Sequence, residues 1–441
     1  MDTIYNSEPV SNSSIADKFN FLLIALYITS FFYCLPIIKL NYSGLITDIR
    51  LYDLIFPLIL WNFILKNFKQ FKLESTTVAY AKYNYIFISI IFISLFLTYT
   101  YGGPFKLLIA MVRFYRIVSF WSIGLIIIVY IKDHQRLKQL IYVFYFNCVL
   151  QAFLGGLQTL DFLPNFWPDY WQAMYGDLYS VGTLAPHHKH IGIIMILTVG
   201  LSVAVLRSKN NILIKCIAVI SIAAAIFTTM GADSRTGYGA ILVYLIYSLL
   251  FLRGGQASRI IGVLFSIIIL FYAIGPAVGE RIQYIEGRQQ VMSSHEGGII
   301  AGNLATRSWI WKKIISRLYE RPLLLLFGSG FQNNSEYGGI GGAHNNYLHI
   351  LAELGLYGFM IYFLWLKNIY HEMKYKSLNS NSSFGRIYCS EILAIYVSIL
   401  ITMLIGETLY AQRAMMSLSG QLNILFAFGT HPLWLSDNHG K

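Results

Sequence analysis

Charge is scarce in this chain: only 12% of its 441 residues are Asp, Glu, Lys or Arg. Soluble domains carry about twice that share, so the composition excludes an ordinary soluble protein. Cysteine is scarce too, and the four cysteines show no paired spacing that would indicate a disulfide framework or a metal site. There is no basic tail, and membrane topology explains the net charge of +12 better than nucleic-acid binding does.

Apolar residues, in contrast, make up 56% of the chain. Crossing a bilayer takes about 20 apolar residues, and runs of this kind predict an all-α polytopic membrane protein with about twelve transmembrane helices. The predicted spans lie near residues 19–38, 51–66, 83–101, 107–130, 139–160, 190–206, 213–230, 237–252, 259–278, 344–366, 387–406 and 419–436.

The predicted order of segments follows from these runs. It is a cytoplasmic tail at 1–18, spans one to nine within 19–278, one large, partly helical periplasmic loop at 279–343, spans ten to twelve within 344–436, and a cytoplasmic tail at 437–441. Short loops rich in Lys and Arg stay in the cytoplasm, and five such loops alternate with leaner ones. The large loop is also basic, but long segments cross regardless of charge, so it is predicted to be external.

Two segments outside the spans have recognisable patterns. Residues 161–189 are rich in Trp and Tyr, which favours interfacial anchors, with a carbohydrate-stacking platform as the alternative. Residues 306–318 place apolar side chains at helical spacing and predict an amphipathic helix along the membrane face, ended by Pro322. The glycine-rich stretch from Gly328 onward suits a loop that wraps or releases a bulky substrate.

Candidate site residues lie at the predicted external ends of spans. His344 and Asn345 begin the tenth span, Arg235 follows the seventh, and Arg307 begins the amphipathic helix. Arginine can clamp a diphosphate with its planar fork of donors, and histidine can accept a proton from an attacking hydroxyl. The simpler alternatives are a snorkelling anchor for each arginine and a helix cap for the histidine. Taken together, the residues indicate transfer from a lipid diphosphate.

Three further residues are expected to support this site. Arg113 and Arg116 share one face of the fourth span and are expected to meet either substrate phosphates or an internal carboxylate such as Glu391 or Glu407. His190 closes a His-His-Lys-His sequence that leads into the sixth span. Ligands adjacent in sequence rarely converge on one metal, so helix entry is favoured and no metal site is predicted.

Residues 180–365 resemble the O-antigen ligase/O-antigen polymerase family of bacterial envelope glycan assembly. The resemblance rests on ordered parts: Ser234-Arg235 after a span, Arg307 with Trp311, then Pro322 and Gly328-Ser329-Gly330, and finally His344-Asn345 with Gly355 and Gly358. The first 170 residues match only in hydropathy. The order and spacing of these parts carry the resemblance, because each fragment alone is common.

The resemblance implies a glycosyltransferase of the C-type (GT-C) architecture in the bacterial inner membrane, with its active site facing the periplasm. It implies an undecaprenyl-diphosphate-linked glycan as donor, inversion at the anomeric carbon, and no cofactor or metal. Arg235 and Arg307 would bind the diphosphate, His344 would activate the acceptor hydroxyl, and Asn345 would orient the histidine.

The acceptor divides the family. A polymerase uses a lipid-linked repeat unit, a ligase uses lipid A-core, and a protein O-oligosaccharyltransferase uses pilin or another protein. We favour a polymerase, because polymerases are many and diverse in sequence, and we expect a chain-length regulator as a possible partner. The non-enzymatic alternative is a transporter of lipid-linked oligosaccharide, for which the sequence lacks the expected inverted repeats and interrupted helices in matching halves.

Overall fold

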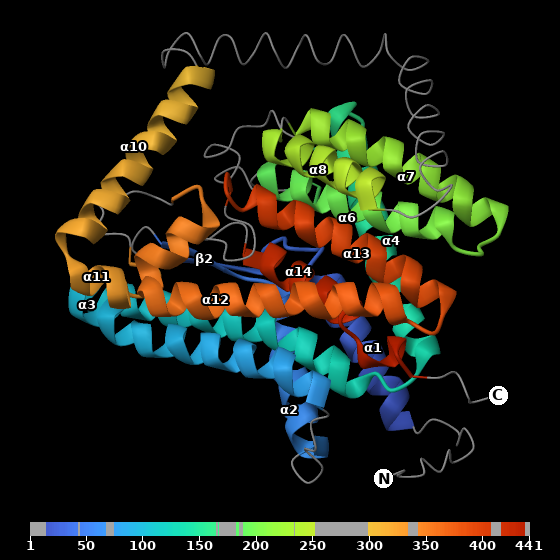
Figure 1. Ribbon diagram of the computed structural model, residues 1–441, viewed down its shortest axis with the longest axis horizontal. Coiled ribbons are helices and arrows are strands. Elements are labelled where there is room, and N and C mark those ends of the chain that lie inside the picture. The colour runs from blue at the N-terminus through green and yellow to red at the C-terminus, as the bar shows by residue number, and fades with distance from the viewer. Residues whose placement is uncertain are drawn as a thin grey trace.

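Helices dominate the computed structural model, which describes residues 15–42, 45–67, 75–164, 166, 182–184, 188–232, 234–251, 299–333, 343–406 and 416–436 (Figure 1). The elements before the large loop are α1 (Ile15–Ser30), β1 (Ile38–Tyr42), β2 (Leu45–Ile49), α2 (Leu51–Asn67), α3 (Ser75–Tyr130), α4 (His134–Thr159), α6 (His188–Arg207), α7 (Ile212–Gly231) and α8 (Arg235–Phe251). The later helices are α10 (Ile299–Glu320), α11 (Pro322–Phe327), α12 (Asn346–Asn379), α13 (Ser383–Thr402), α14 (Met416–Gly429) and a 3-10 turn at Pro432–Trp434.

Six helices among the described residues are long and apolar enough to cross a membrane. They are Lys82–Tyr130, His134–Thr159, His190–Arg207, Ile212–Gly231, Asn346–Asn379 and Ser383–Thr402. The chain is therefore a helical, multi-pass membrane protein. α2, α8 and α14 match three further predicted spans but are shorter, at 17, 17 and 14 residues. The predicted span at 259–278 lies outside the described residues, so the number of twelve spans stays a prediction.

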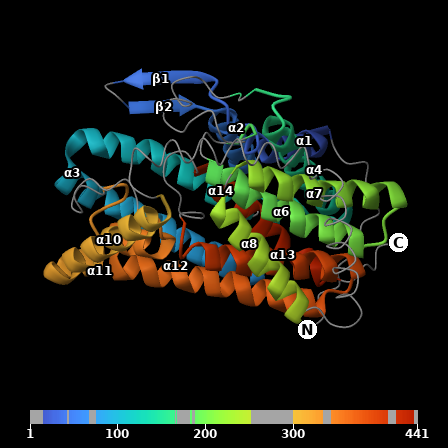
Figure 2. The same cartoon turned by 90° about the horizontal axis from the view of Figure 1, so that it is seen from above.

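The predicted first span, 19–38, is wrong in its second half. α1 ends at Ser30, and β1 then pairs with β2 in an antiparallel hairpin in which Ile38 lies opposite Ile49. Pro36 accounts for the change, because proline disfavours helical backbone at the residue before it. Figure 2 shows the hairpin on the outside of the helices.

α3 consists of two antiparallel arms. Its backbone leaves the helical region at Gly103, where φ is 76°. The side-chain amide of Asn84 donates a 3.0 Å hydrogen bond to the carbonyl of Trp121, 37 positions later. A straight helix would separate these residues by about 55 Å, so the helix folds back on itself. The two arms correspond to the predicted spans 83–101 and 107–130.

α12 also folds back, at Gly355, where φ is 67°. The side-chain amide of Asn346 donates a 2.8 Å hydrogen bond to the hydroxyl of Tyr362, 16 positions later. A straight helix would hold them about 24 Å apart. The predicted tenth span, 344–366, therefore contains a sharp turn: residues 346–354 form a short returning arm, and residues 356–379 form the longer arm (Figure 1).

Glycine is required where the returning arm meets the end of α11. A β-carbon on Gly355 would overlap the carbonyl of Leu326, and one on Gly328, where φ is 77°, would overlap the carbonyl of Glu353. Only glycine combines a positive φ with such close backbone contact. The glycine-rich stretch that was predicted to be a flexible loop therefore begins, at Gly328, in close backbone packing. Residues 334–342 lie outside the described part of the structure.

α10 and α11 pack on the returning arm through a small apolar cluster that is separate from the main core of the bundle. Its buried members are Ile310, Ile314, Leu318, Leu324, Ala343 and Ala352. The three α10 residues recur every four positions and so share one face, as predicted for the amphipathic helix at 306–318. In Figure 1, α10 leaves the end of the bundle at a steep angle to α12.

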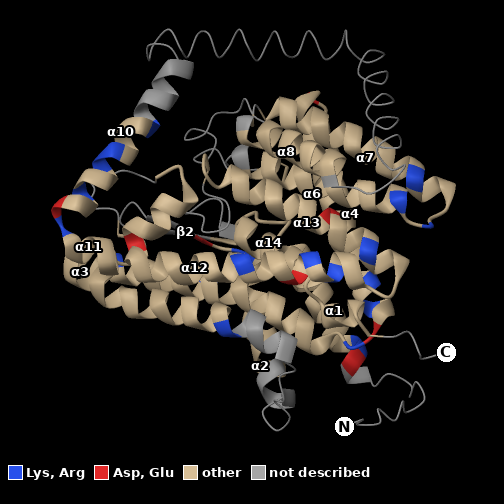
Figure 3. Cartoon of the chain, in the orientation of Figure 1, with Lys and Arg blue, Asp and Glu red and all other residues tan. Residues whose placement is uncertain are grey.

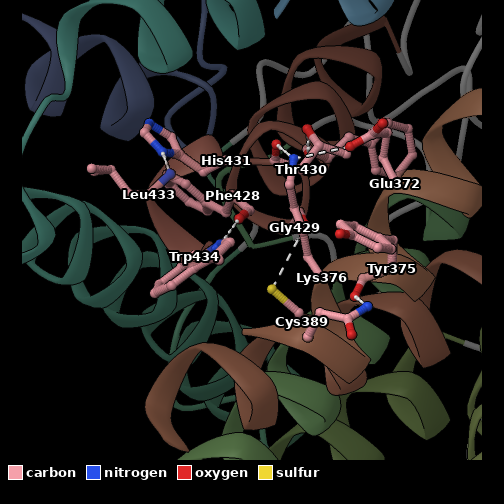
Figure 4. Close-up of polar contacts among 12 residues, drawn as sticks. Glu372, Tyr375, Lys376, Cys389, Phe428, Gly429, Thr430, His431, Leu433 and Trp434 are labelled. Carbon is pink, nitrogen blue, oxygen red and sulfur yellow. Dashed lines mark hydrogen bonds and ion pairs between the residues drawn. The ribbon is translucent and has the colours of Figure 1, made fainter. Parts of the chain in front are cut away.

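The end of the molecule away from α10 carries much of the Lys and Arg (Figure 3). There, carbonyls at the C-terminal end of α14 are capped by distant side chains (Figure 4). Trp434 Nε1 donates to Phe428 O at 2.6 Å, Cys389 Sγ to Gly429 O at 3.7 Å, and Lys376 Nζ to Thr430 O. A cation is favourable at a helix C-terminus, so the buried Lys376 has a structural role here.

Candidate active site

His344 stands in the turn that opens the returning arm of α12. Its φ of 50° lies in the left-handed region, and its side chain is half-buried. The next residue, Asn345, is the N-cap of the helix, because its side-chain oxygen accepts a 3.0 Å hydrogen bond from the backbone N–H of Leu348. Asn345 thus supports His344 through the backbone of the turn, in the capping role that asparagine commonly has.

The start of the returning arm is fixed to the C-terminal end of α13. The backbone N–H of Asn346 donates a 2.8 Å hydrogen bond to the carbonyl of Met403. The hydroxyl of Tyr347 donates a 3.0 Å hydrogen bond to the carbonyl of Leu400. His344 consequently lies beside the segment where α13 ends.

Arg307 and Trp311 attach α10 to the same region. Arg307 Nη1 donates to the carbonyl of Ile405 at 3.2 Å, and Trp311 Nε1 donates to the carbonyl of Ala343 at 2.7 Å. The two side chains are four positions apart, so they lie on one face of the helix. The predicted phosphate ligand Arg307 and the predicted base His344 therefore belong to neighbouring segments.

Arg235 is the first residue of α8, and its side chain lies outside the described part of the structure. Contacts of the neighbouring residues Ser234 and Thr236 nevertheless fix the start of α8. Ser234 is buried, and its Oγ accepts a 3.2 Å hydrogen bond from the backbone N–H of Gly237. Thr236 lies beside Gly406, since a β-carbon on that glycine would be 3.5 Å from Thr236 Cγ2.

The segment 400–406 is thus the junction where the three predicted site elements meet. Met403 contacts the start of the returning arm, Ile405 contacts Arg307, and Gly406 contacts the start of α8. We did not predict this junction as part of the site. The sequence contained a signal for it, because the predicted topology puts the end of the span 387–406 on the same side of the membrane as the candidate residues.

Arg113 contacts the segment that follows α11, next to the joint at which α11 packs on the returning arm of α12. Its guanidinium donates to Gln332 Oε1. The segment carrying Gln332 is held on α3 and α12: the hydroxyl of Thr98 donates to the carbonyl of Phe331 at 2.8 Å, and the N–H of Gly330 donates to the carbonyl of Glu353 at 3.0 Å. The described partners of Arg113 are therefore protein groups of this joint.

Arg116 pairs with an internal carboxylate, but neither of the two that we predicted. Its guanidinium makes hydrogen bonds of 3.0 and 2.7 Å to the two carboxylate oxygens of Asp53 and also donates to the carbonyl of Asp48. Glu391 pairs instead with Arg207 and Tyr244. Glu407 lies outside the described residues. Arg116 thereby fastens α3 to the β hairpin and α2.

His190 is fully buried in the bundle. Its Nε2 lies 3.0 Å from Gln421 Oε1, and Gln421 Nε2 donates to the carbonyl of Phe31 at 2.8 Å. This chain of hydrogen bonds connects α6, α14 and α1. His190 is two residues before Gly192, against which Ser234 packs, so it supports the start of α8 from inside the bundle.

A buried pair on the returning arm was missed in the sequence. His349 Nε2 lies 2.9 Å from Glu353 Oε1, and both side chains are at most 1% exposed. Neither residue was among the predicted site residues. The spacing of four positions on a helix was the available signal, since such residues face each other. The pair places two further ionisable groups on the arm that begins with His344.

The family model described as O-antigen ligase matches residues 217–363. That segment contains Arg235, Arg307 and His344, and it does not include Arg113, Arg116, His190 or the junction at 400–406. No curated protein matches the chain.

Proposed function

We propose that this chain, which belongs to the O-antigen ligase/polymerase family through residues 217–363, is a membrane glycosyltransferase. It transfers a glycan from a lipid diphosphate, of the undecaprenyl type, to an acceptor hydroxyl. We further propose a GT-C architecture with twelve spans in the bacterial inner membrane, and an active site on the periplasmic side.

The observation that carries the proposal is the junction at 400–406. It brings together the turn with His344, the helix with Arg307 and the first turn of the helix with Arg235. These three elements are far apart in the sequence. Segments that carry a histidine and two arginines thus meet at one junction, and a base and two guanidinium groups are the groups required to move a glycan off a diphosphate.

The proposed reaction is an in-line displacement at the anomeric carbon. The acceptor oxygen forms the new glycosidic bond as its proton passes to the imidazole of His344. The bond between the anomeric carbon and the diphosphate oxygen breaks, and the lipid diphosphate leaves with both bonding electrons. Arg235 and Arg307 neutralise the leaving group as its charge develops, which is the kind of stabilisation that contributes most to enzymatic rates. The anomeric configuration inverts, and the proposal needs no metal or cofactor.

The supporting residues act on this site through the protein. Asn345 caps the returning arm, Arg113 binds the segment after α11 that packs on this arm, and His190 supports the start of α8. Arg116 acts elsewhere, in its pair with Asp53 on α2. In this proposal none of the four is required to touch the diphosphate.

We propose an O-antigen or surface-polysaccharide polymerase, with a lipid-linked repeat unit as acceptor and a chain-length regulator as partner. A deletion strain tests this choice. Single repeat units on lipid A-core would support a polymerase, long chains retained on the lipid diphosphate would identify a ligase, and loss of protein-linked glycan alone would identify a protein O-oligosaccharyltransferase.

The test of the chemistry uses purified protein with a synthetic lipid-diphosphate oligosaccharide and a hydroxyl acceptor. We expect a covalent product of inverted configuration, formed equally well in the presence of a chelator. Movement of the donor across proteoliposomes without any covalent product would contradict the proposal and identify a transporter.

A further inference from the structure

The turn at His344 is restrained on both sides. Before it, the carbonyl of Ala343 accepts the indole N–H of Trp311 at 2.7 Å. After it, Asn345 caps the helix at 3.0 Å. Between these hydrogen bonds, the backbone of His344 holds a φ of 50°, which a residue with a β-carbon adopts only when its surroundings determine it. The direction of the imidazole depends on this backbone.

We propose that Trp311 is a positioning residue for His344. The indole N–H holds the Ala343 carbonyl in the orientation that the left-handed turn requires, and thus aims the imidazole at the acceptor hydroxyl. This inference rests on the proposed function. It assigns to Trp311 a role in the rate of transfer and none in holding the donor.

A substitution can separate the effect of the Trp311 hydrogen bond from the effect of its packing. The ring packs, half-buried, against the apolar cluster shared by α10, α11 and the returning arm. Phenylalanine would keep an aromatic ring in that cluster and lose the N–H. Trp309 provides a matched control two residues away, because its ring is 56% exposed and faces the ammonium of Lys313 at 4.9 Å.

The kinetic test compares Trp311→Phe and Trp309→Phe with wild type in the purified transfer assay. A single hydrogen bond of this kind changes a population by roughly 3- to 10-fold. We expect Trp311→Phe to lower kcat by this factor with the donor KM unchanged, and Trp309→Phe to behave as wild type. In a His344→Ala background, Trp311→Phe should cause no further loss, because the group that it positions is gone.

Hydrogen exchange gives a second readout that does not depend on transfer. Exchange of the amides in residues 343–348 should be several times faster in Trp311→Phe and unchanged in Trp309→Phe. Unchanged exchange together with unchanged kcat would overturn the inference, and so would an equal loss of rate with and without His344. If His344→Ala itself turns over at the wild-type rate, the catalytic assignment fails. In that case the inference about Trp311 fails with it, even where the exchange result shows that the turn has loosened.

Discussion

Tyr362 holds Asn346 across the fold-back of α12: the two side chains are joined by a 2.8 Å hydrogen bond although 16 positions separate them. Asn346 is also fixed through its backbone to Met403 in the junction. Tyr362 therefore determines where the returning arm lies, and so where His344 begins it. A hydroxyl buried in the bundle contributes to the site without being near the chemistry.

Tyr362→Phe should lower both stability and transfer. The variant removes the 2.8 Å hydrogen bond between the Tyr362 hydroxyl and the amide of Asn346, and a bond of this kind contributes about 0.5 to 1.5 kcal/mol. We expect a fall of a few degrees in the unfolding temperature and a larger relative fall in transfer rate. Tyr357→Phe is the control, since Tyr357 is 58% exposed. Equal rates in the two variants would show that the arm keeps its place without this bond.

His344→Ala should abolish most transfer while leaving insertion and folding intact. A general base contributes about 10²- to 10⁴-fold, so a small residual rate is expected. The measurement is turnover with lipid-linked donor and acceptor, alongside the elution profile of the variant in detergent. His371→Ala, an exposed histidine on the same helix, is the control. Turnover near that of the control would remove His344 from the mechanism.

Arg307→Lys and Arg235→Lys should each lose activity by about 10- to 100-fold, because a charge-assisted bidentate contact is replaced by a point charge. The substitution distinguishes diphosphate binding from a structural role, since lysine can still donate to the carbonyl of Ile405 and can still anchor at the interface. Arg317→Lys on α10 is the control, as Arg317 pairs with Glu320 at 3.5 Å near the surface. Full activity in both site variants would show that these arginines have a structural role and do not bind the diphosphate.

Local patterns predicted much of this arrangement. The apolar runs gave the membrane class, and the helical spacing at 306–318 gave α10 together with its buried face. Loop charge placed Arg235, Arg307 and His344 on one side of the membrane, which is compatible with their meeting at one junction. Such features depend on neighbours in the sequence, and so they can be read from it.

The fold-backs and the long-range pairs could not be predicted in the same way. Gly355 lies inside a predicted span, where an isolated glycine is usually tolerated, and the backbone near Gly328 packs against it where the chain turns. Arg116 pairs with Asp53, 63 positions away in the sequence, in place of the predicted Glu391 or Glu407. The deciding contacts in both cases come from tertiary packing.

Sidedness underlies the proposed site, and cysteine labelling can measure it. The background lacks the four native cysteines, of which Cys216 is exposed and the others are buried. Three exposed positions then serve as probes: Ser316 on α10, and Lys209 and Asn379 in basic connections. An impermeant reagent added to intact cells should label Ser316→Cys at once and the other two only after lysis, because basic short loops stay inside.

Ser234, at the start of α8, is fully buried, so its failure to label would carry no information on sidedness. The exposed probes avoid this ambiguity. Labelling of Lys209→Cys or Asn379→Cys in intact cells would invert the topology and place the junction at 400–406 in the cytoplasm. A donor presented on the periplasmic side could not then reach His344, and the proposed reaction would have to be abandoned.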